Sequence, residues 1–283
     1  MDNFHISKIL SWSILVVMSA ACKQEDGRQL DELPITEKGY SSPEEYPDMT
    51  IVWRDEFDSD GLDPAHWSHE IGGHGWGNNE LQYYQESNTE VRDGYAIITA
   101  RKENKEDKNY TSSRIITKGK KEFKYGRVDI RALLPRGQGI WPALWMLGSN
   151  ISIVDWPACG EIDIMEMIGG QGKDNVLHGT AHWEKAGKHE YQGGNISLKN
   201  EQIFADEFHV FSISWTPSSI VWYLDGVLYY ELDITSEELA EFHNSYYFIF
   251  NVAVGGNWPG NPDETTTFPQ RLVVDYIRVF QGE

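Results

Sequence analysis

The stretch FSISWTPSSIVWYLDGVLYYE, residues 211–231, decides the fold class. Its first five residues alternate large apolar side chains with serines, which is the period-two pattern of a strand with one buried face. Asp225-Gly226 then separates two runs of apolar and aromatic residues, and this dipeptide favours a two-residue hairpin turn. The stretch therefore predicts consecutive antiparallel strands.

Further strands are expected along the chain. Segments rich in β-branched and aromatic residues, separated by Gly, Asp and Asn turns, are residues 95–101, 126–134, 246–254 and 271–280. A helix is predicted only around residues 235–241. This spacing favours an antiparallel sandwich or barrel, and about 235 residues without an internal repeat fit a larger jelly roll. We predict an all-β fold with one domain over residues 49–283.

The composition limits the possible ligands. The chain of 283 residues carries 24 Lys and Arg against 44 Asp and Glu, a formal net charge of −20. Nucleic acids and sulfated polysaccharides bind basic surfaces, so we expect neither as a partner. The 11 Trp, 14 Tyr and 11 Phe suit stacking on a flat ligand, and two cysteines exclude a disulfide scaffold.

The N-terminus reads as a targeting segment. Lys8 precedes the apolar run Ile9–Ala21, which is too short for a membrane span but has the length of a signal-peptide core. Residues 1–21 resemble a bacterial lipoprotein signal, with Cys22 as the lipidated first residue of the mature chain. Ser19 departs from that pattern, and ordinary secretion without lipidation is the alternative. We expect an outer-membrane lipoprotein of the cell envelope. The acidic residues after Cys22 resemble surface-export signals of some lipoproteins and indicate exposure on the cell surface.

Residues 22–48 are polar and charged and show no periodicity. Such a segment buries too little apolar surface to fold by itself. We predict a tether whose only membrane contact is the lipid on Cys22.

Three carboxylates lie close together in Glu161-Ile-Asp-Ile-Met-Glu166, a segment that reads as a strand. Glu161 and Asp163 share a face because strand side chains alternate. Glu166 would face the other way unless a β-bulge near residues 164–165 adds one residue to the strand. Two carboxyls on one face, with a third between them, suit the acid and nucleophile of glycoside hydrolysis.

Two other readings of these carboxylates are open. The strand could simply present an acidic outer face, which has some weight in so acidic a chain. A metal site is less favoured, because no neighbouring Cys or His set completes a ligand geometry.

The motif resembles the Glu-x-Asp-x-x-Glu signature of glycoside hydrolase family 16, within it the laminarinase-like endo-1,3-β-glucanases. The resemblance extends over residues 50–281 in the family's order, through the segments 53–57, 75–84, 110–115, 139–148, 179–183, 250–259 and 274–279. It implies a β-jelly roll of two curved antiparallel sheets with a glycan in the concave cleft. It also implies Glu161 as nucleophile, Asp163 as its partner and Glu166 as acid/base.

The same resemblance suggests residues that contact the sugar. Trp141, Trp145 and Trp156 would supply flat platforms for pyranose rings. Asn79 and Arg114 match positions that hydrogen-bond sugar hydroxyls, and His182 would be a partner of the acid/base carboxyl.

Other tryptophans have structural readings. Trp53, Trp67 and Trp215 are expected in the core, as is Cys159, whereas Trp258 could line the cleft or pin its loop.

No cofactor is expected for catalysis. Relatives often carry a structural Ca²⁺, and the matching positions are Glu56, the Gly94 carbonyl and Asp275. Each also has an ordinary reading as a turn glycine or a surface acid. We expect a monomer.

The leading functional hypothesis is a retaining endo-hydrolase of 1,3-β-glucan such as laminarin. A mixed-linkage 1,3-1,4-β-glucanase is the alternative within the same class. Relatives that cut sulfated chains share the motif, but this sequence lacks a basic cluster for sulfate. A surface glycan-binding lipoprotein without catalysis is the alternative from another class, and the intact carboxylate set argues against it.

Overall fold

The computed structural model describes Met1 and residues 35–282. The predicted signal peptide and Cys22 lie outside the described residues. Residues from Thr36 onward form one compact unit. Within the part of the chain that is described, no helix is long and apolar enough to cross a membrane.

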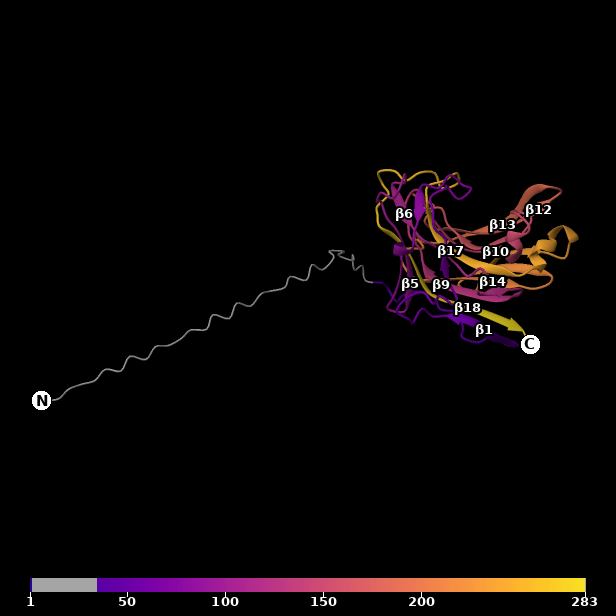
Figure 1. Ribbon diagram of the computed structural model, residues 1–283. Coiled ribbons are helices and arrows are strands. Elements are labelled where there is room, and N and C mark those ends of the chain that lie inside the picture. The colour runs from indigo at the N-terminus through magenta and orange to yellow at the C-terminus, as the bar shows by residue number, and fades with distance from the viewer. Residues whose placement is uncertain (2–34, 283) are drawn as a thin grey trace. The chain divides into compact units, whose positions relative to one another are not determined.

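Two large antiparallel sheets stack face to face, as Figure 1 shows. One, here called the outer sheet, has the strand order β16-β15-β14-β9-β18-β5-β4, with β1 added alongside β18. Its strands are β1 Met49–Asp55, β4 Thr89–Arg92, β5 Tyr95–Ala100, β9 Gly126–Leu133, β14 His209–Trp215, β15 Ser219–Leu224, β16 Val227–Asp233 and β18 Gln270–Gly282.

The other sheet carries the cleft on its open face and is called the cleft sheet. Its order is β13-β12-β11-β10-β17-β7-β2, with β8 paired to β17. Its strands are β2 Ser68–His69, β7 Arg114–Ile116, β8 Glu122–Phe123, β10 Ile140–Gly148, β11 Glu161–Glu166, β12 Val176–Lys185, β13 Lys188–Ser197 and β17 Tyr246–Val254. The predicted jelly-roll sandwich of two antiparallel sheets is confirmed.

Short elements complete the domain. β3 Gln82–Tyr84 pairs in parallel with β6 Tyr110–Ser112. The 3-10 helices are η1 Glu86–Asn88, η2 Ser149–Ser152 and η3 Glu237–His243. The helix predicted near residues 235–241 is therefore η3, which begins after the Ser236 cap.

The hydrophobic core lies between the two sheets. Trp53, Trp67 and Trp215 are buried in it, as predicted, and Cys159 is fully buried in a smaller cluster. Desolvation raises the pKa of the Cys159 thiol to about 11, so this cysteine stays protonated and unreactive.

The predicted tether, residues 22–48, includes residues that belong to the folded domain. Gly39 bridges Phe208, and the Tyr46 hydroxyl donates to the Asp129 carboxylate at 2.8 Å. Arg131 donates to the Tyr40 carbonyl at 2.7 Å. The charged side chains of β9 point away from the core, and these contacts hold the N-terminal segment against them, so the domain begins near Thr36 and not at residue 49. Sequence periodicity could not show this, because the segment docks without forming a regular strand.

Candidate active site

A β-bulge places the three carboxylates of β11 on the open face of the cleft sheet. Against β12, Asp163 pairs with Thr180 and Glu166 with His178, so Ile164 and Met165 together oppose Gly179. Against β10, the partners of Glu161 and Glu166 are Leu147 and Ala143. The predicted bulge is confirmed, and with it the shared face of all three carboxyls.

Neighbouring strands send alternate residues to the same face. β10 contributes Trp141 and Trp145, β12 contributes His178 and His182, and β17 contributes Asn251. Period-two alternation in register across adjacent strands brings these distant positions together. They line a cleft of about 800 Å³.

His182 contacts the first two carboxyls and not the third. Its Nε2 lies 3.0 Å from Oδ2 of Asp163 and 3.7 Å from Oε1 of Glu161. The expectation that His182 partners the Glu166 carboxyl is therefore wrong. Cross-strand register decides this, because His182 lies directly opposite Glu161, whereas His178 lies opposite Glu166.

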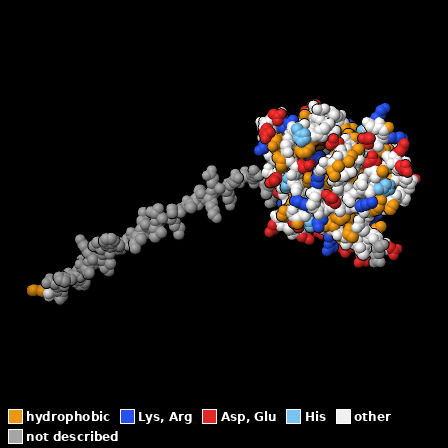
Figure 2. Space-filling view, turned by 45° about the vertical axis from the view of Figure 1, so that its right-hand side comes forward, with side chains coloured by type: hydrophobic (Ala, Val, Ile, Leu, Met, Phe, Trp, Pro, Cys, Tyr) orange, Lys and Arg blue, Asp and Glu red, His pale blue; other side chains and the backbone are white. Residues whose placement is uncertain are grey.

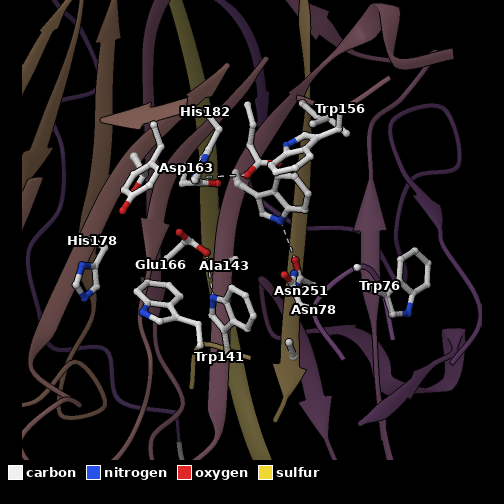
Figure 3. A pocket seen from close by; sticks show the side chains of 18 of the residues that line it. Trp76, Asn78, Trp141, Ala143, Trp156, Asp163, Glu166, His178, His182 and Asn251 are labelled. Carbon is white, nitrogen blue, oxygen red and sulfur yellow. Dashed lines mark hydrogen bonds and ion pairs between the residues drawn. The ribbon is translucent and has the colours of Figure 1, made fainter. Parts of the chain in front are cut away.

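Glu166 is held by a tryptophan. The indole Nε1 of Trp141 donates to Oε1 of Glu166 at 3.0 Å. Figure 3 shows Glu166 between Asp163 and Trp141 in the floor of the cleft. Trp141 thus orients the carboxyl while its ring faces the cavity.

Burial changes the ionisation of this cluster. Desolvation raises the pKa of Glu161, Asp163 and Glu166, to about 8 in each case, and the Asp163 charge adds to the effect at both glutamates. His182 partly offsets this rise in the pKa at both glutamates. The three groups titrate together, so the cluster keeps at least one proton at neutral pH. A site with one carboxylate and one carboxylic acid has the components of acid-assisted displacement at an acetal.

Aromatic rings line the cleft, as predicted for Trp141, Trp145 and Trp156. The Trp156 side chain is 45% exposed and packs on His189 with ring centroids 4.6 Å apart. Trp258 meets Trp141 edge to face at 5.5 Å and His178 at 5.1 Å, so it shapes the cleft wall. These flat faces suit the apolar C–H face of a sugar ring.

Arg114 lies between two indole rings. Its guanidinium is 4.8 Å from the ring centroids of both Trp76 and Trp145, and it forms an ion pair with Glu70. Arg114 lines the cavity, and its predicted hydrogen bonds to sugar hydroxyls stay a prediction. Its charge, however, is already balanced by Glu70.

Asn79 does not line the cavity, although it was expected to bind sugar. Its backbone is left-handed, with φ 56°, and its Nδ2 donates to Oδ1 of Asn257 at 2.9 Å. Asn78 and Glu80 on either side line the cleft instead. The turn at residue 79 directs this side chain to the neighbouring loop.

A buried hydrogen-bond network that the sequence did not reveal supports the Trp145 platform. Trp145 Nε1 donates to Asn251, whose amide donates to the Tyr84 hydroxyl at 3.1 Å. Tyr84 in turn donates to Glu80, which also accepts from Gln82 at 2.6 Å. Glu80 is 6% exposed, and burial raises its pKa. Asn251 was signalled by its polar side chain in the apolar strand β17 and by its place in the family-like segment 250–259.

One group of side chains could hold a metal among the described residues: Glu161, Asp163 and His182, whose ligand atoms lie within 4.8 Å of one another. His182 reaches the two carboxyls because β12 pairs with β11, whereas the sequence near the carboxylates contains no histidine that could complete a metal site. His182 already contacts both carboxyls within this cluster.

The carboxylates predicted for Ca²⁺ have other partners. Glu56 accepts two hydrogen bonds from Arg278, both at 2.8 Å, and Asp275 accepts one from Arg131 at 2.6 Å. A calcium ion would compete with both guanidinium groups for these oxygens. The side-chain arrangement does not favour the Glu56, Gly94 and Asp275 site, which stays a prediction.

Residues 77–278 match the model of glycosyl hydrolases family 16. The chain belongs to this family. Family 16 proteins resemble it in both sequence and structure. A curated β-glucanase from Rhodothermus marinus is 42% identical over 262 residues, which cover 86% of this chain and 89% of the relative.

Two solved structures extend the comparison. The laminarinase catalytic domain of Thermotoga maritima has a TM-score of 0.77 at 48% identity, covering 83% of this chain and 99% of that one. A variant of LamA from Zobellia galactanivorans, in complex with laminaritriose and laminaritetraose, has a TM-score of 0.73 at 34% identity over 82% and 99% of the two chains. The family 16 assignment makes the protein a glycoside hydrolase.

Proposed function

We propose that the protein is a retaining endo-hydrolase of 1,3-β-glucan linkages, with Glu161 as nucleophile and Glu166 as acid/base. The observation that carries the proposal is the bulge in β11, which turns both glutamates and Asp163 into one aromatic-lined cleft. Similarity over more than four fifths of the chain to a solved laminarinase domain, and to LamA in complex with laminaritriose and laminaritetraose, supports the choice of substrate.

The geometry assigns each carboxyl a step. Glu166 keeps its proton at neutral pH because burial raises its pKa, and it passes that proton to the glycosidic oxygen as the bond breaks. Glu161 attacks the anomeric carbon and forms a glycosyl-enzyme. Glu166, now ionised, takes a proton from water, which then displaces Glu161 from the sugar with net retention.

His182 and Asp163 support the nucleophile. His182 Nε2 lies between Oε1 of Glu161 and Oδ2 of Asp163, so it bridges the two carboxyls. His182 opposes the rise in the pKa of Glu161 that burial and the Asp163 charge cause, and this favours the ionised form that attacks carbon.

Hydrolysis of laminarin, followed by proton NMR of the first products, tests the proposal. A retaining enzyme should release the β-anomer first. An endo-hydrolase should release a mixture of oligosaccharides rather than a single small sugar. Glu161→Ser should abolish hydrolysis and still bind laminari-oligosaccharides. No sugar released from laminarin, or release at the wild-type rate by the variant, contradicts the assignment.

Azide distinguishes the two glutamates. With an activated aryl glucoside, Glu161→Ser plus azide should give the α-glycosyl azide, because azide attacks in place of the nucleophile. Glu166→Ala plus azide should give the β-glycosyl azide, because azide then attacks the covalent intermediate. Exchanged products would reverse the roles.

A mixed-linkage 1,3-1,4-β-glucanase is the second candidate. The similar Rhodothermus marinus protein is named only as a β-glucanase, which leaves the linkage open. Initial rates on laminarin and on a cereal mixed-linkage glucan rank the two activities. A higher rate on the cereal glucan would favour this candidate.

A sulfated substrate is not favoured. Among the described residues that line the cavity, Arg114 is the one arginine or lysine, and Glu70 already balances its charge. Figure 2 likewise shows basic side chains dispersed among acidic ones on the face in view. A non-catalytic glycan binder is excluded if Glu161→Ser loses an activity that the wild type has.

We further propose attachment of the mature chain to the outer membrane through lipid on Cys22. Labelling of growing cells with a fatty acid should mark the wild type and leave Cys22→Ala unlabelled. Label retained by the variant, or absent from the wild type, contradicts lipidation.

A further inference from the structure

A chain of polar contacts leads from the catalytic centre to solvent through two histidines. Asp163 Oδ2 lies 3.0 Å from Nε2 of His182, and the other ring nitrogen of His182, Nδ1, lies 2.8 Å from Nε2 of His189. The side chain of Asp163 is 4% exposed, that of His182 is 18% exposed, and His189 is exposed. The contacts therefore join a buried carboxyl to the surface.

Strand register produces this arrangement. His182 on β12 lies opposite Tyr191 on β13, and His189 comes from the same face of β13, two residues before Tyr191. The two imidazole rings stack with centroids 5.1 Å apart and planes at 22°. Trp156 also packs on His189, with ring centroids 4.6 Å apart.

The chemistry of imidazole makes these contacts interdependent. A neutral ring carries one proton, on either nitrogen. When Asp163 is ionised, Nε2 of His182 holds the proton toward it, so Nδ1 must accept a hydrogen bond, and Nε2 of His189 must donate one. When Asp163 is protonated, it donates to Nε2 of His182, and both histidine contacts reverse.

The surroundings of His189 favour its neutral form. Partial burial and the facing His182 lower the pKa of His189, and Glu190 opposes this. Two imidazolium groups at 2.8 Å would repel each other, so the contact needs at least one neutral ring.

We propose that His189 is a positioning residue that fixes the tautomer of His182, and through it the orientation of the proton toward Asp163. This rests on the proposed function, since it assigns His182 and Asp163 to the support of Glu161. Sequence gave no indication of it, because the three residues belong to three strands.

Two substitutions separate this role from simple packing. His189→Gln keeps a side-chain amide that can donate to or accept from His182 Nδ1, but removes the aromatic ring. His189→Phe keeps a ring against Trp156 and Tyr191 but has no polar atom. Lys188→Gln, an exposed change on the same strand, is the control.

The expected result is a kcat for His189→Phe about tenfold below wild type with little change in KM, the scale on which second partners of functional imidazoles act. His189→Gln should recover most of the loss, and Lys188→Gln should match wild type. The reverse order, with the Phe variant active and the Gln variant impaired, shows a packing role and overturns the proposal. An increase in KM alone indicates contact with the glycan and overturns it as well.

Nitrogen NMR of the histidine rings gives a readout that is independent of hydrolysis. At a pH above the pKa of Asp163, His182 of the wild type and of His189→Gln should carry its proton on Nε2. His189→Phe should show a mixture of tautomers. The same single tautomer in all three proteins overturns the proposal even if laminarin is cleaved, whereas a wild type without glucanase activity refutes the proposed function and leaves this test intact.

Discussion

The indole Nε1 of Trp222 donates a hydrogen bond of 2.8 Å to the main-chain carbonyl of Asp163 across the interior of the sandwich. Trp222 belongs to β15 of the outer sheet, and Asp163 immediately precedes the bulge in β11 of the cleft sheet. A bulge interrupts the regular ladder and leaves a backbone group without its usual partner. Here the opposite sheet supplies that partner, so one buried tryptophan connects the core to the catalytic strand.

Trp222→Phe should therefore weaken both stability and catalysis. The Asp163 carbonyl would be left buried without this donor, at a cost of about 1–3 kcal/mol in the free energy of unfolding. The bulge that aims Glu166 would be less well fixed, so kcat should fall. Urea denaturation and laminarin kinetics measure the two effects.

Trp215→Phe is the matched control. Trp215 Nε1 donates to the Phe242 carbonyl at 3.0 Å, and this residue is also buried in the outer sheet. Its loss should lower stability to a similar extent without lowering kcat. An equal fall in kcat for both variants would show that Trp222 acts only through stability.

Gly179→Ala tests the space opposite the bulge. A Cβ at this position would lie 2.4 Å from Cδ1 of Trp222 and 2.4 Å from the Tyr229 hydroxyl. Overpacking of this kind costs about 1–3 kcal/mol, and it should also displace Trp222 from its hydrogen bond. Gly61→Ala, where nothing lies within 4 Å, should keep the wild-type stability and activity. Wild-type values for Gly179→Ala would show that the core relaxes to accept the methyl group.

The carboxyl cluster predicts a decrease in stability as pH rises. Unfolded glutamate and aspartate titrate at 4.5 and 3.8, whereas burial raises the pKa of the three cluster groups to about 8. Between these values the folded chain binds more protons than the unfolded chain, so this contribution to stability is full in acid and falls as pH rises. Glu166→Gln removes one of these ionisations and should show a shallower fall between pH 4.5 and about 8. Glu264→Gln, an exposed control, should follow the wild type, and parallel curves for all three proteins would contradict the raised pKa of Glu166.

Activity should also fall on the alkaline side. Glu166 must carry a proton to act as acid, and its pKa is raised to about 8. The alkaline limb of kcat/KM should therefore lie well above the ordinary glutamate value of 4.5. A limb close to that ordinary value would contradict the assignment of Glu166 as the acid.

The N-terminal segment should stabilise the domain without taking part in catalysis. A chain that begins at residue 49 loses the Tyr46 contact to Asp129 and the Ser42 contact to the Tyr276 hydroxyl. Asp129 is 0% exposed and keeps its contact with Arg127, so the loss of the Tyr46 donor should cost about 1–3 kcal/mol relative to a chain that begins at residue 35. Both chains should have the same kcat at low temperature, because the segment contacts the outer sheet and not the cleft. Equal unfolding midpoints for the two chains would show that residues 35–48 do not stabilise the domain and belong to the tether.

The sequence by itself determined the fold class and the face of the strand that carries the three carboxylates. Alternation fixes which side chains of a strand share a face, and the hairpin turn at Asp225-Gly226 fixes antiparallel pairing, because both are local properties of the chain. The odd spacing of Glu166 from Glu161 was enough to require the bulge, which the register of β11 confirms. The family motifs added the cleft tryptophans and Arg114.

Only the tertiary structure decided the partners of these residues. His182 faces Glu161 and contacts Asp163 because of the register between β11 and β12. The Trp222 donor reaches Asp163 because two sheets stack, and residues 38–46 dock on charged side chains of β9 that alternation alone would place in solvent. Each of these contacts joins residues far apart in the chain, so their geometry depends on strand order, register and sheet packing, which no local pattern of side chains encodes.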